Sequence, residues 1–283
     1  MFDGHIASAA LGLASAASWG AGDFCGGVAT KRAGVYAVVI GAHLVGAVLF
    51  VALAVTLGET VPPPASLLWC GAAGVIGALG LLALYRALAD GRMGMAAPIS
   101  GVLSAAVPVV AGALLQGSPG ALTLAGFALA FVAVWLVSQT DEGRVHLREL
   151  LLPVAAGLSF GVFIAIVSRM SGSVVFWPLV AARVASLSVL TLVAVVARQP
   201  SRPTRQQWPI VSLAGLFDAG GNACLVAAAH AGRLDVAAVL SSLYPASTVL
   251  LASWILKERI TRWQSAGLVA ALAAIAMITV KST

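Results

Sequence analysis

Charged residues are scarce in this chain: 9% of its 283 residues are Asp, Glu, Lys or Arg, whereas 60% are hydrophobic. A soluble globular protein carries about a quarter charged residues to cover its surface, so this composition excludes that class. The three cysteines are isolated inside apolar runs and form no CxxC pair, which indicates neither a disulfide framework nor a metal site. No P-loop or other cofactor motif occurs. We therefore expect no cofactor, no metal and no catalytic residue.

The chain consists instead of apolar runs of roughly 18 to 24 residues, long enough to cross about 30 Å of hydrocarbon as helices. Gly, Pro and charged residues separate these runs. The ten predicted spans cover residues 6–29, 35–57, 67–89, 94–116, 121–138, 150–168, 175–197, 208–230, 235–256 and 263–280. The sequence thus predicts an all-α polytopic membrane protein that crosses the cell (inner or plasma) membrane ten times, with the lipid bilayer as a partner.

The sequence also contains an internal repeat. A shift of 141 positions places Gly91–Gly126 on Gly232–Gly267 without a gap, and Ser18-Trp19-Gly20 on Ser159-Phe160-Gly161. The same shift places Gly74 on Gly215 and Gly80 on Gly221. Identities are only about twice those that so Ala- and Leu-rich a composition gives by chance, so the constant register carries more weight. We predict two five-helix repeats, residues 1–140 and 150–283, joined by residues 141–149.

The positive charge is concentrated in alternate loops. Five spans per repeat is an odd number, so the second repeat must enter the membrane inverted relative to the first. The loops after spans 1, 3, 5, 7 and 9 contain twelve cations: Lys31, Arg32, Arg86, Arg92, Arg144, Arg148, Arg198, Arg202, Arg205, Lys257, Arg259 and Arg262. The opposite side has three: Arg169, Arg233 and Lys281. This distribution is typical of an inverted repeat that follows the positive-inside rule, with both termini outside. The net charge of +6 is therefore interpreted as membrane orientation, and no nucleic-acid partner is expected.

Four stretches form a recognisable set: Trp19-Gly20 in the first span, Arg183 in the seventh, Leu243-Tyr244-Pro245 in the ninth, and Leu256-Lys257-Glu258-Arg259-Ile260-Thr261 before the tenth. Together they resemble the EamA family of the drug/metabolite transporter superfamily. The resemblance implies ten helices in two five-helix repeats and transport of small metabolites or drugs. It covers the whole chain and is most specific in the second half, because the first half has Gly117-Ser118 in place of Glu258-Arg259. It also implies cytoplasmic termini, opposite to the orientation that the loop charges predict.

Few polar side chains fall inside the predicted spans, where each is costly and needs a reason. They are Asp23, His43, Arg183, Asp218 and Asn222. Asp218 and Asn222 are four residues apart and share one helix face. Asp218 also lies near the middle of its span, where transporters built from inverted repeats tend to bind substrate. We predict that these residues bind substrate or couple its movement to an ion. The alternative is that they pair with backbone or with one another to hold helices together.

Three aromatic residues at the level of the spans complete the candidate site: Trp19, Tyr85 and Tyr244. Trp19 shares a helix face with Asp23. Aromatic rings at this depth can line a cavity or stack on a cationic substrate. Arg183 has two alternative roles: its side chain snorkels to the interface, or it binds an anionic group.

The sequence favours a secondary transporter that exports small metabolites or drugs, such as amino acids, by alternating access. In this interpretation Asp218 exchanges a proton for substrate, and Asp23 shares that role. The alternative is a passive facilitator or channel of the same fold, whose flux ignores a proton gradient. An enzyme is not expected, although Gly157-Leu158-Ser159-Phe160-Gly161 matches a serine nucleophile elbow, because that elbow requires a strand-to-helix turn. The expected partners are a small-molecule substrate and the bilayer, with the protein a monomer or a homodimer.

Overall fold

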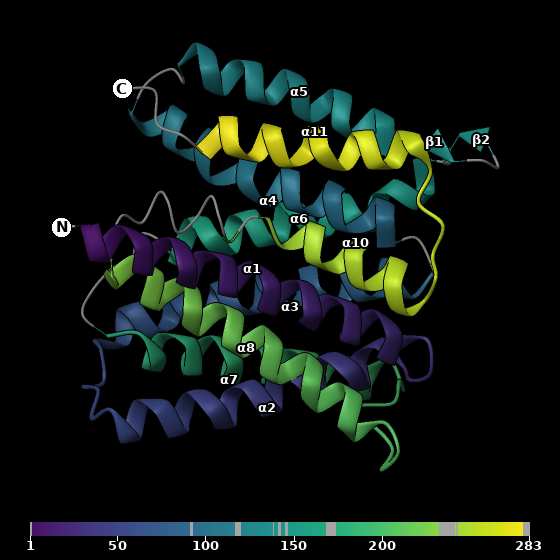
Figure 1. The fold of residues 1–283 in the computed structure, drawn as a ribbon. Coiled ribbons are helices and arrows are strands. Elements are labelled where there is room, and N and C mark those ends of the chain that lie inside the picture. The colour runs from purple at the N-terminus through teal and green to yellow at the C-terminus, as the bar shows by residue number, and fades with distance from the viewer. Residues whose placement is uncertain are drawn as a thin grey trace.

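Long apolar stretches with few helix breakers form helices here, because a helix satisfies its own backbone hydrogen bonds within a bilayer. The computed structural model describes residues 2–90, 93–116, 120–137, 139–140, 143–144, 147–167, 174–231, 241 and 243–279. The first half contains α1 (Phe2–Thr30), α2 (Val35–Thr56), α3 (Pro64–Ala89), α4 (Met93–Gln116) and α5 (Ala121–Val137). The second half contains α6 (Leu147–Val167), α7 (Phe176–Val196), α8 (Trp208–Ala231), α10 (Tyr244–Ile255) and α11 (Arg262–Thr279) (Figure 1).

The ten helices of the described residues confirm the predicted fold class. Five of them, α2, α3, α6, α7 and α8, are long and apolar enough by length and composition to cross a membrane. The ninth predicted span, residues 235–256, is represented by α10, which begins at Tyr244; residues 232–240 lie outside the described part. The sequence did not predict β1 (Gln139–Thr140) and β2 (Gly143–Arg144), a short antiparallel pair in the connection between the halves.

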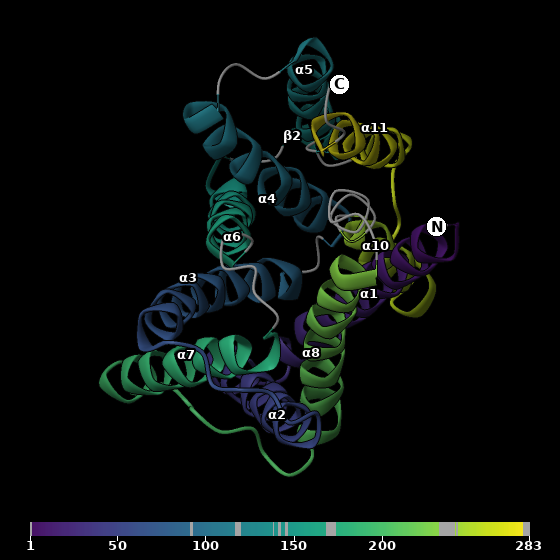
Figure 2. The same ribbon diagram turned by 90° about the vertical axis from the view of Figure 1, so that its left-hand side faces the viewer.

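Each helix packs mainly on helices of the other half of the chain. Helix α1 packs on α8 and α10, and α6 packs on α3 and α4. Likewise α3 contacts α7, and α2 contacts α8. The repeat makes α1, α2, α3 and α4 the counterparts of α6, α7, α8 and α10. Each contact just named then has its counterpart in another, for example α1 with α8 and α6 with α3, as an approximate two-fold axis requires. Viewed from the end, α3 and α6 lie on one side of the bundle and α1 and α8 on the other (Figure 2). Helices α5 and α11 pack on each other at the edge.

Glycine contacts show the same relation at the level of single residues. A Cβ added to Gly80 would lie 2.7 Å from the Ser159 Cβ and 3.1 Å from the Phe160 ring. Added to Gly221, which is 141 positions later, it would lie 2.4 Å from the Trp19 ring. Trp19 is in turn the counterpart of Phe160. The 141-residue shift read from the sequence therefore also relates contacts in space.

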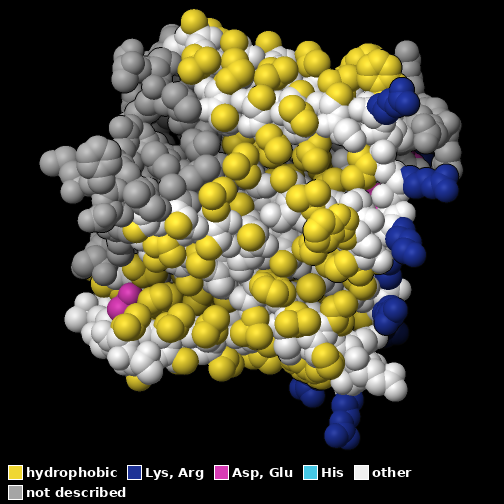
Figure 3. All heavy atoms as spheres, in the orientation of Figure 1, with side chains coloured by type: hydrophobic (Ala, Val, Ile, Leu, Met, Phe, Trp, Pro, Cys, Tyr) yellow, Lys and Arg dark blue, Asp and Glu magenta, His cyan; other side chains and the backbone are white. Residues whose placement is uncertain are grey.

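The surface separates into an apolar belt and one cation-rich end. Exposed apolar side chains cover the flanks, among them Phe131, Val196 and Trp254, which are 78%, 76% and 81% exposed. Lys and Arg gather at the end drawn on the right in Figure 3. Helix α1 begins and α11 ends at the other end. A surface of this kind is typical of a protein whose flanks face lipid. The chain is an integral membrane protein.

Two glutamates join the halves at opposite ends of the bundle. The Glu59 carboxylate, just after α2, accepts hydrogen bonds from the backbone N–H groups of Val175, Phe176 and Trp177 at the start of α7, at 2.9, 2.8 and 3.3 Å. Glu258, just after α10, accepts one from the Gly94 N–H at the start of α4, at 3.4 Å. Both carboxylates complement the positive end of a helix dipole.

Glu258 contacts helices of both repeats. Its side chain reaches α4, in the first repeat, while its backbone N–H closes α10, on the Ala252 carbonyl at 3.3 Å. The Glu258 Oε2 atom is buried and has no hydrogen-bond partner among the described groups.

We expect Glu258 to make stability depend on pH. Burial raises its pKa from the ordinary 4.5, while the Gly94 N–H and the Lys31 charge act in the opposite direction. A carboxyl that holds its proton more tightly when folded contributes less stability as the pH rises from its ordinary pKa through the raised one. The melting temperature of the purified protein should therefore rise on acidification within that window, and Glu258→Gln should reduce this rise. Glu59→Gln is the control, because it also replaces a carboxylate that accepts hydrogen bonds at the start of a helix. An unchanged slope in Glu258→Gln would assign the effect to other groups.

Candidate functional site

A cavity lies between the two halves, where α1, α3, α6, α7 and α8 meet. It holds about 780 Å³ of empty space, its opening included. Helices α2, α4 and α10 each contribute one lining side chain, His43, Ser104 and Tyr244. Its lining is mostly apolar, and a few polar side chains converge on it, as in pockets that bind small molecules. The cavity is therefore the candidate functional site.

Helix α1 is held against α8 by hydroxyl groups, which fixes the residues that α1 presents to the cavity. Ser15 donates a hydrogen bond to the Gly221 carbonyl at 2.8 Å, and Ser18 to the Phe217 carbonyl at 2.7 Å. Trp19 and Asp23, one turn apart, both line the cavity. The Trp19 ring meets the Tyr244 ring edge to face, with centroids 6.3 Å apart. Thus α1, α8 and α10 meet at one polar and aromatic corner.

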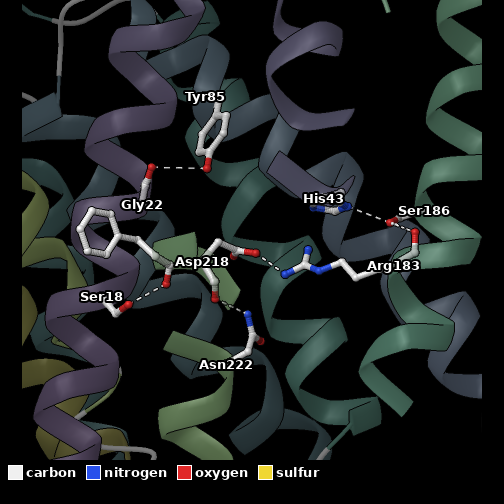
Figure 4. Close-up of polar contacts among 9 residues, drawn as sticks. Ser18, Gly22, His43, Tyr85, Arg183, Ser186, Asp218 and Asn222 are labelled. Atoms are coloured by element: carbon white, nitrogen blue, oxygen red, sulfur yellow. Dashed lines mark hydrogen bonds and ion pairs between the residues drawn. The ribbon is translucent and has the colours of Figure 1, made fainter. Parts of the chain in front are cut away.

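An ion pair joins α7 to α8 in the lining. The Arg183 Nη2 donates to the Asp218 Oδ2, and the two side chains are only 11% and 17% exposed (Figure 4). The guanidinium also lies 5.6 Å from the centre of the Phe50 ring, in cation–π geometry. A Cβ added to Gly46 would come within 3.4 Å of the Arg183 Nε, so a glycine at 46 leaves space for this side chain. The helix of Asp218 contains no Lys or Arg of its own, and the cation comes from the neighbouring helix α7.

Two further polar groups are oriented by this pair. The Asn222 amide donates to the Asp218 carbonyl at 2.7 Å. The Ser186 hydroxyl donates its single hydrogen to the Arg183 carbonyl at 2.9 Å and lies 2.8 Å from the His43 Nδ1.

Asp23 differs from these residues because its carboxylate has no hydrogen-bond partner among the residues that the structure describes. It is 8% exposed and lines the cavity, yet it accepts no hydrogen bond from any group in the described part of the chain. A buried carboxylate without a partner is costly. Nearby hydroxyls have other partners: Ser100 donates to the Ala97 carbonyl at 2.9 Å, and the Ser100 and Tyr244 hydroxyls are 3.4 Å apart. Asp23 is therefore a group that a ligand or a proton can satisfy.

Tyr85 lies outside the cavity lining, unlike the other seven predicted site residues. It is fully buried, and its hydroxyl donates to the Gly22 carbonyl at 3.4 Å. A Cβ added to Gly26 would lie 2.0 Å from the ring, so Tyr85 fills the space beside this glycine. Tyr85 therefore packs in the contact between α1 and α3. Among the described residues, no group of three or more His, Cys, Asp or Glu is placed to hold a metal ion.

The comparison with protein families decides what kind of protein contains this cavity. The model of the EamA-like transporter family matches residues 6–139 and again residues 147–280. The chain belongs to this family. Both ends of the second match lie 141 residues after those of the first, which is the shift that relates the halves in sequence and in space.

Solved structures support the fold of this EamA-like protein and no more. Twenty-two of their chains match it. One crystal structure superposes with a TM-score of 0.68 over 95% of both chains, at 17% sequence identity. At that identity the likeness concerns the fold alone. No curated protein sequence matches the chain. Members of the family are transporters, and Ser159 of the elbow-like motif lies inside α6, without the strand-to-helix turn that the motif needs.

The repeat explains lining residues that the sequence did not single out. Four pairs of lining residues are related by the 141-residue shift: Trp19/Phe160, Asp23/Ile164, Gly77/Asp218 and Leu81/Asn222. The cavity of this EamA-like chain therefore lies on the approximate two-fold axis. Applying the 141-residue shift to four of the predicted site residues, Trp19, Asp23, Asp218 and Asn222, would have found Phe160, Ile164, Gly77 and Leu81. Phe163, Ser104 and Ser186 had no such signal.

These pairs give the cavity two chemically different sides. The polar wall consists of Asp23 on α1, Arg183 on α7, and Asp218 and Asn222 on α8. The apolar wall consists of Leu81 on α3 and Phe160, Phe163 and Ile164 on α6. Because α1 with α8 and α6 with α3 are related by the two-fold axis, the backbone is symmetric while the chemistry is not. Such a cavity fits a molecule that is polar at one end and apolar at the other.

Proposed function

We propose that this EamA-like protein is a secondary transporter that exports small metabolites or drugs by alternating access, driven by a proton gradient. The site lies in the cell membrane with the cation-rich end in the cytoplasm, as the positive-inside rule requires. The two halves rock around the central cavity, which then opens to each side in turn. The observation that carries the proposal is Asp23, a carboxylate buried in the lining between the repeats with no hydrogen-bond partner among the described residues.

The charge on Asp23 provides the coupling. A charge in a low-dielectric region costs several kcal/mol unless it is paired. Arg183 and Asp218 neutralise each other, so Asp23 is the group that must be neutralised before the cavity closes. Either a proton or a substrate can do this. When the cavity is empty and Asp23 is unprotonated, the protein switches slowly between the states open to either side of the membrane. When Asp23 is protonated or substrate is bound, it switches readily. This assigns the proton to Asp23, whereas the sequence had placed it first on Asp218.

Purified protein in liposomes tests the coupling. We expect a radiolabelled substrate from a panel of phenylalanine, adenosine and trimethyl(2-phenylethyl)ammonium to accumulate only when a pH difference is imposed. Asp23→Asn keeps the size of the side chain and removes its titration. This variant should lose accumulation, because no proton can be exchanged, and should still fold and insert into the liposomes.

Asp90→Asn, which changes a carboxyl in the turn after α3, is the matched control and should behave as the parent. Equilibration of a substrate by the parent, whatever the pH difference, would support the passive facilitator. Gradient-driven accumulation that persists in Asp23→Asn would exclude Asp23 as the proton carrier. Uptake no greater than in empty liposomes would count against transport of all three compounds.

A further inference from the structure

The charges around the cavity do not balance. Among the lining residues within the described part, three side chains are formally charged when histidine is neutral: Asp23, Asp218 and Arg183. Arg183 and Asp218 form an ion pair. The His43 Nδ1 is hydrogen-bonded to the Ser186 hydroxyl, and no carboxylate of the described residues pairs with His43. By formal charge, Asp23 is therefore the one carboxyl among the described lining residues without a paired cation.

The surroundings of Asp23 suit an organic cation. Trp19 is one helical turn away on α1, and Tyr244 packs edge to face on Trp19 and also lines the cavity. The negative faces of aromatic rings attract ammonium groups, and the attraction grows where water is excluded. A carboxylate beside such rings recognises an ammonium head by charge and by shape.

The opposite side of the cavity has no charge to offer. Phe160, Phe163 and Ile164 on α6 and Leu81 on α3 form the apolar wall, and Phe163 packs closely on Gly77. Of the lining side chains that the structure describes, each charged one belongs to the polar wall. An apolar body of one ring or a short chain gains free energy by leaving water for this wall.

We propose that the cavity binds monovalent organic cations with an apolar body, the cationic head at Asp23 and the body on the apolar wall. This names the substrate class of the proposed transporter and rests on that function only for the transport step. A zwitterion fits less well, because its carboxylate needs a cation and Arg183 is already paired with Asp218. An anion adds to the charge of Asp23.

A proton on Asp23 competes with such a cation, since either one neutralises the site. The titratable and charged groups that face Asp23 or share its cavity come from every helix packed on α1, together with α7: Asp218 on α8, Tyr85 on α3, Tyr244 on α10, His43 on α2 and Arg183 on α7. A permanent cation keeps its own charge at every pH. Its affinity should therefore fall as the pH falls.

The test measures binding to the purified full-length protein in detergent by calorimetry, with three probes that share a benzene ring and a short chain. They are trimethyl(2-phenylethyl)ammonium, its zwitterionic relative N,N,N-trimethylphenylalanine, and the anion 4-phenylbutanoate. We expect the cation to bind at least tenfold more tightly than either of the others. Asp23→Asn should lower the affinity for the cation at least tenfold and remove its pH dependence, whereas Asp90→Asn should change neither. Phe163→Ala should weaken the binding of the cation and keep its pH dependence.

Several results would overturn the proposal. Tighter binding of the zwitterion would assign the site to amino-acid-like substrates, and the absence of binding by all three would exclude this class. An unchanged affinity in a folded Asp23→Asn variant would place the cation elsewhere. Binding requires no gradient and no flux, so it is independent of the transport test. If the cation binds and is not driven by a pH difference, the proposed function fails while the substrate class stands. If another compound is driven and the cation does not bind, the reverse holds.

Discussion

Replacing Arg183 by glutamine is expected to cause the largest loss of folded protein among substitutions in the cavity. The change leaves Asp218 and Asp23 together in the lining with no cation among the described residues. Removing one partner of a buried ion pair costs about 3–5 kcal/mol, because the other charge is left uncompensated. The folded yield in membranes and the melting temperature in detergent should both fall sharply.

Two companion variants separate the ion pair from the charge count. Asp218→Asn leaves Arg183 free to neutralise Asp23, so this protein should fold better than Arg183→Gln and bind trimethyl(2-phenylethyl)ammonium at least tenfold less tightly than the parent. In the double variant carrying both changes, Asp23 is the one formally charged side chain of the described lining. The net formal charge of the lining is then the same as in the parent. We expect it to recover stability relative to Arg183→Gln and to bind the cation again. A double variant no more stable than Arg183→Gln would show that the pair does not set the stability of this region.

One added methyl group at Gly74 is expected to have the second-largest effect. The new Cβ would lie 2.3 Å from the Ala182 carbonyl oxygen and 2.5 Å from its Cα, so α3 and α7 must separate. Overpacking typically costs about 1–3 kcal/mol, and more where backbone has to move. Gly74→Ala should lower the melting temperature by several degrees. Gly215→Ala should do the same, since its Cβ would lie 2.4 Å from the Ala42 carbonyl oxygen in the related contact.

Gly94→Ala is the matched control for both variants. Gly94 is also helical, but a Cβ there meets nothing within 4 Å. Alanine has the higher helix propensity, by about 1 kcal/mol, and keeps the backbone N–H that contacts Glu258. This variant should be at least as stable as the parent. If all three variants melt alike, close helix contact at Gly74 and Gly215 does not contribute measurably to stability.

Much of the fold could be predicted because membrane crossing imposes strong and local requirements on sequence. A run such as 35–57 is apolar over a length that matches the bilayer, so its helix, Val35–Thr56, follows from hydropathy alone. The repeat was visible as a constant shift, since glycines at close helix contacts tolerate little change. Gly80 and Gly221 keep their register because side chains of the facing helices occupy the space beside them.

The pairing of the polar residues was harder to predict from the sequence, because it depends on which helices meet. Asp218 has no cation in its own span, and nothing in the chain order indicates that Arg183 on α7 faces it. Tyr85 illustrates the opposite case: a tyrosine within a span suits a cavity and a packing contact equally, and only its position beside Gly26 distinguishes them. Hydropathy reports depth in the membrane, while the direction of a side chain around its helix follows from the neighbours.

The Asp23 carboxylate of the cavity also bears on how membrane voltage acts on this protein. A unit charge that crosses the membrane is worth about 2.3 kcal/mol per 100 mV. In an exchange of one proton for one monovalent cation, Asp23 is neutralised in both crossings, and the Arg183–Asp218 pair is neutral throughout. The loaded cavity then moves no net charge in either direction. Such an exchange is electroneutral, so it responds to the difference in pH across the membrane and not to the membrane potential.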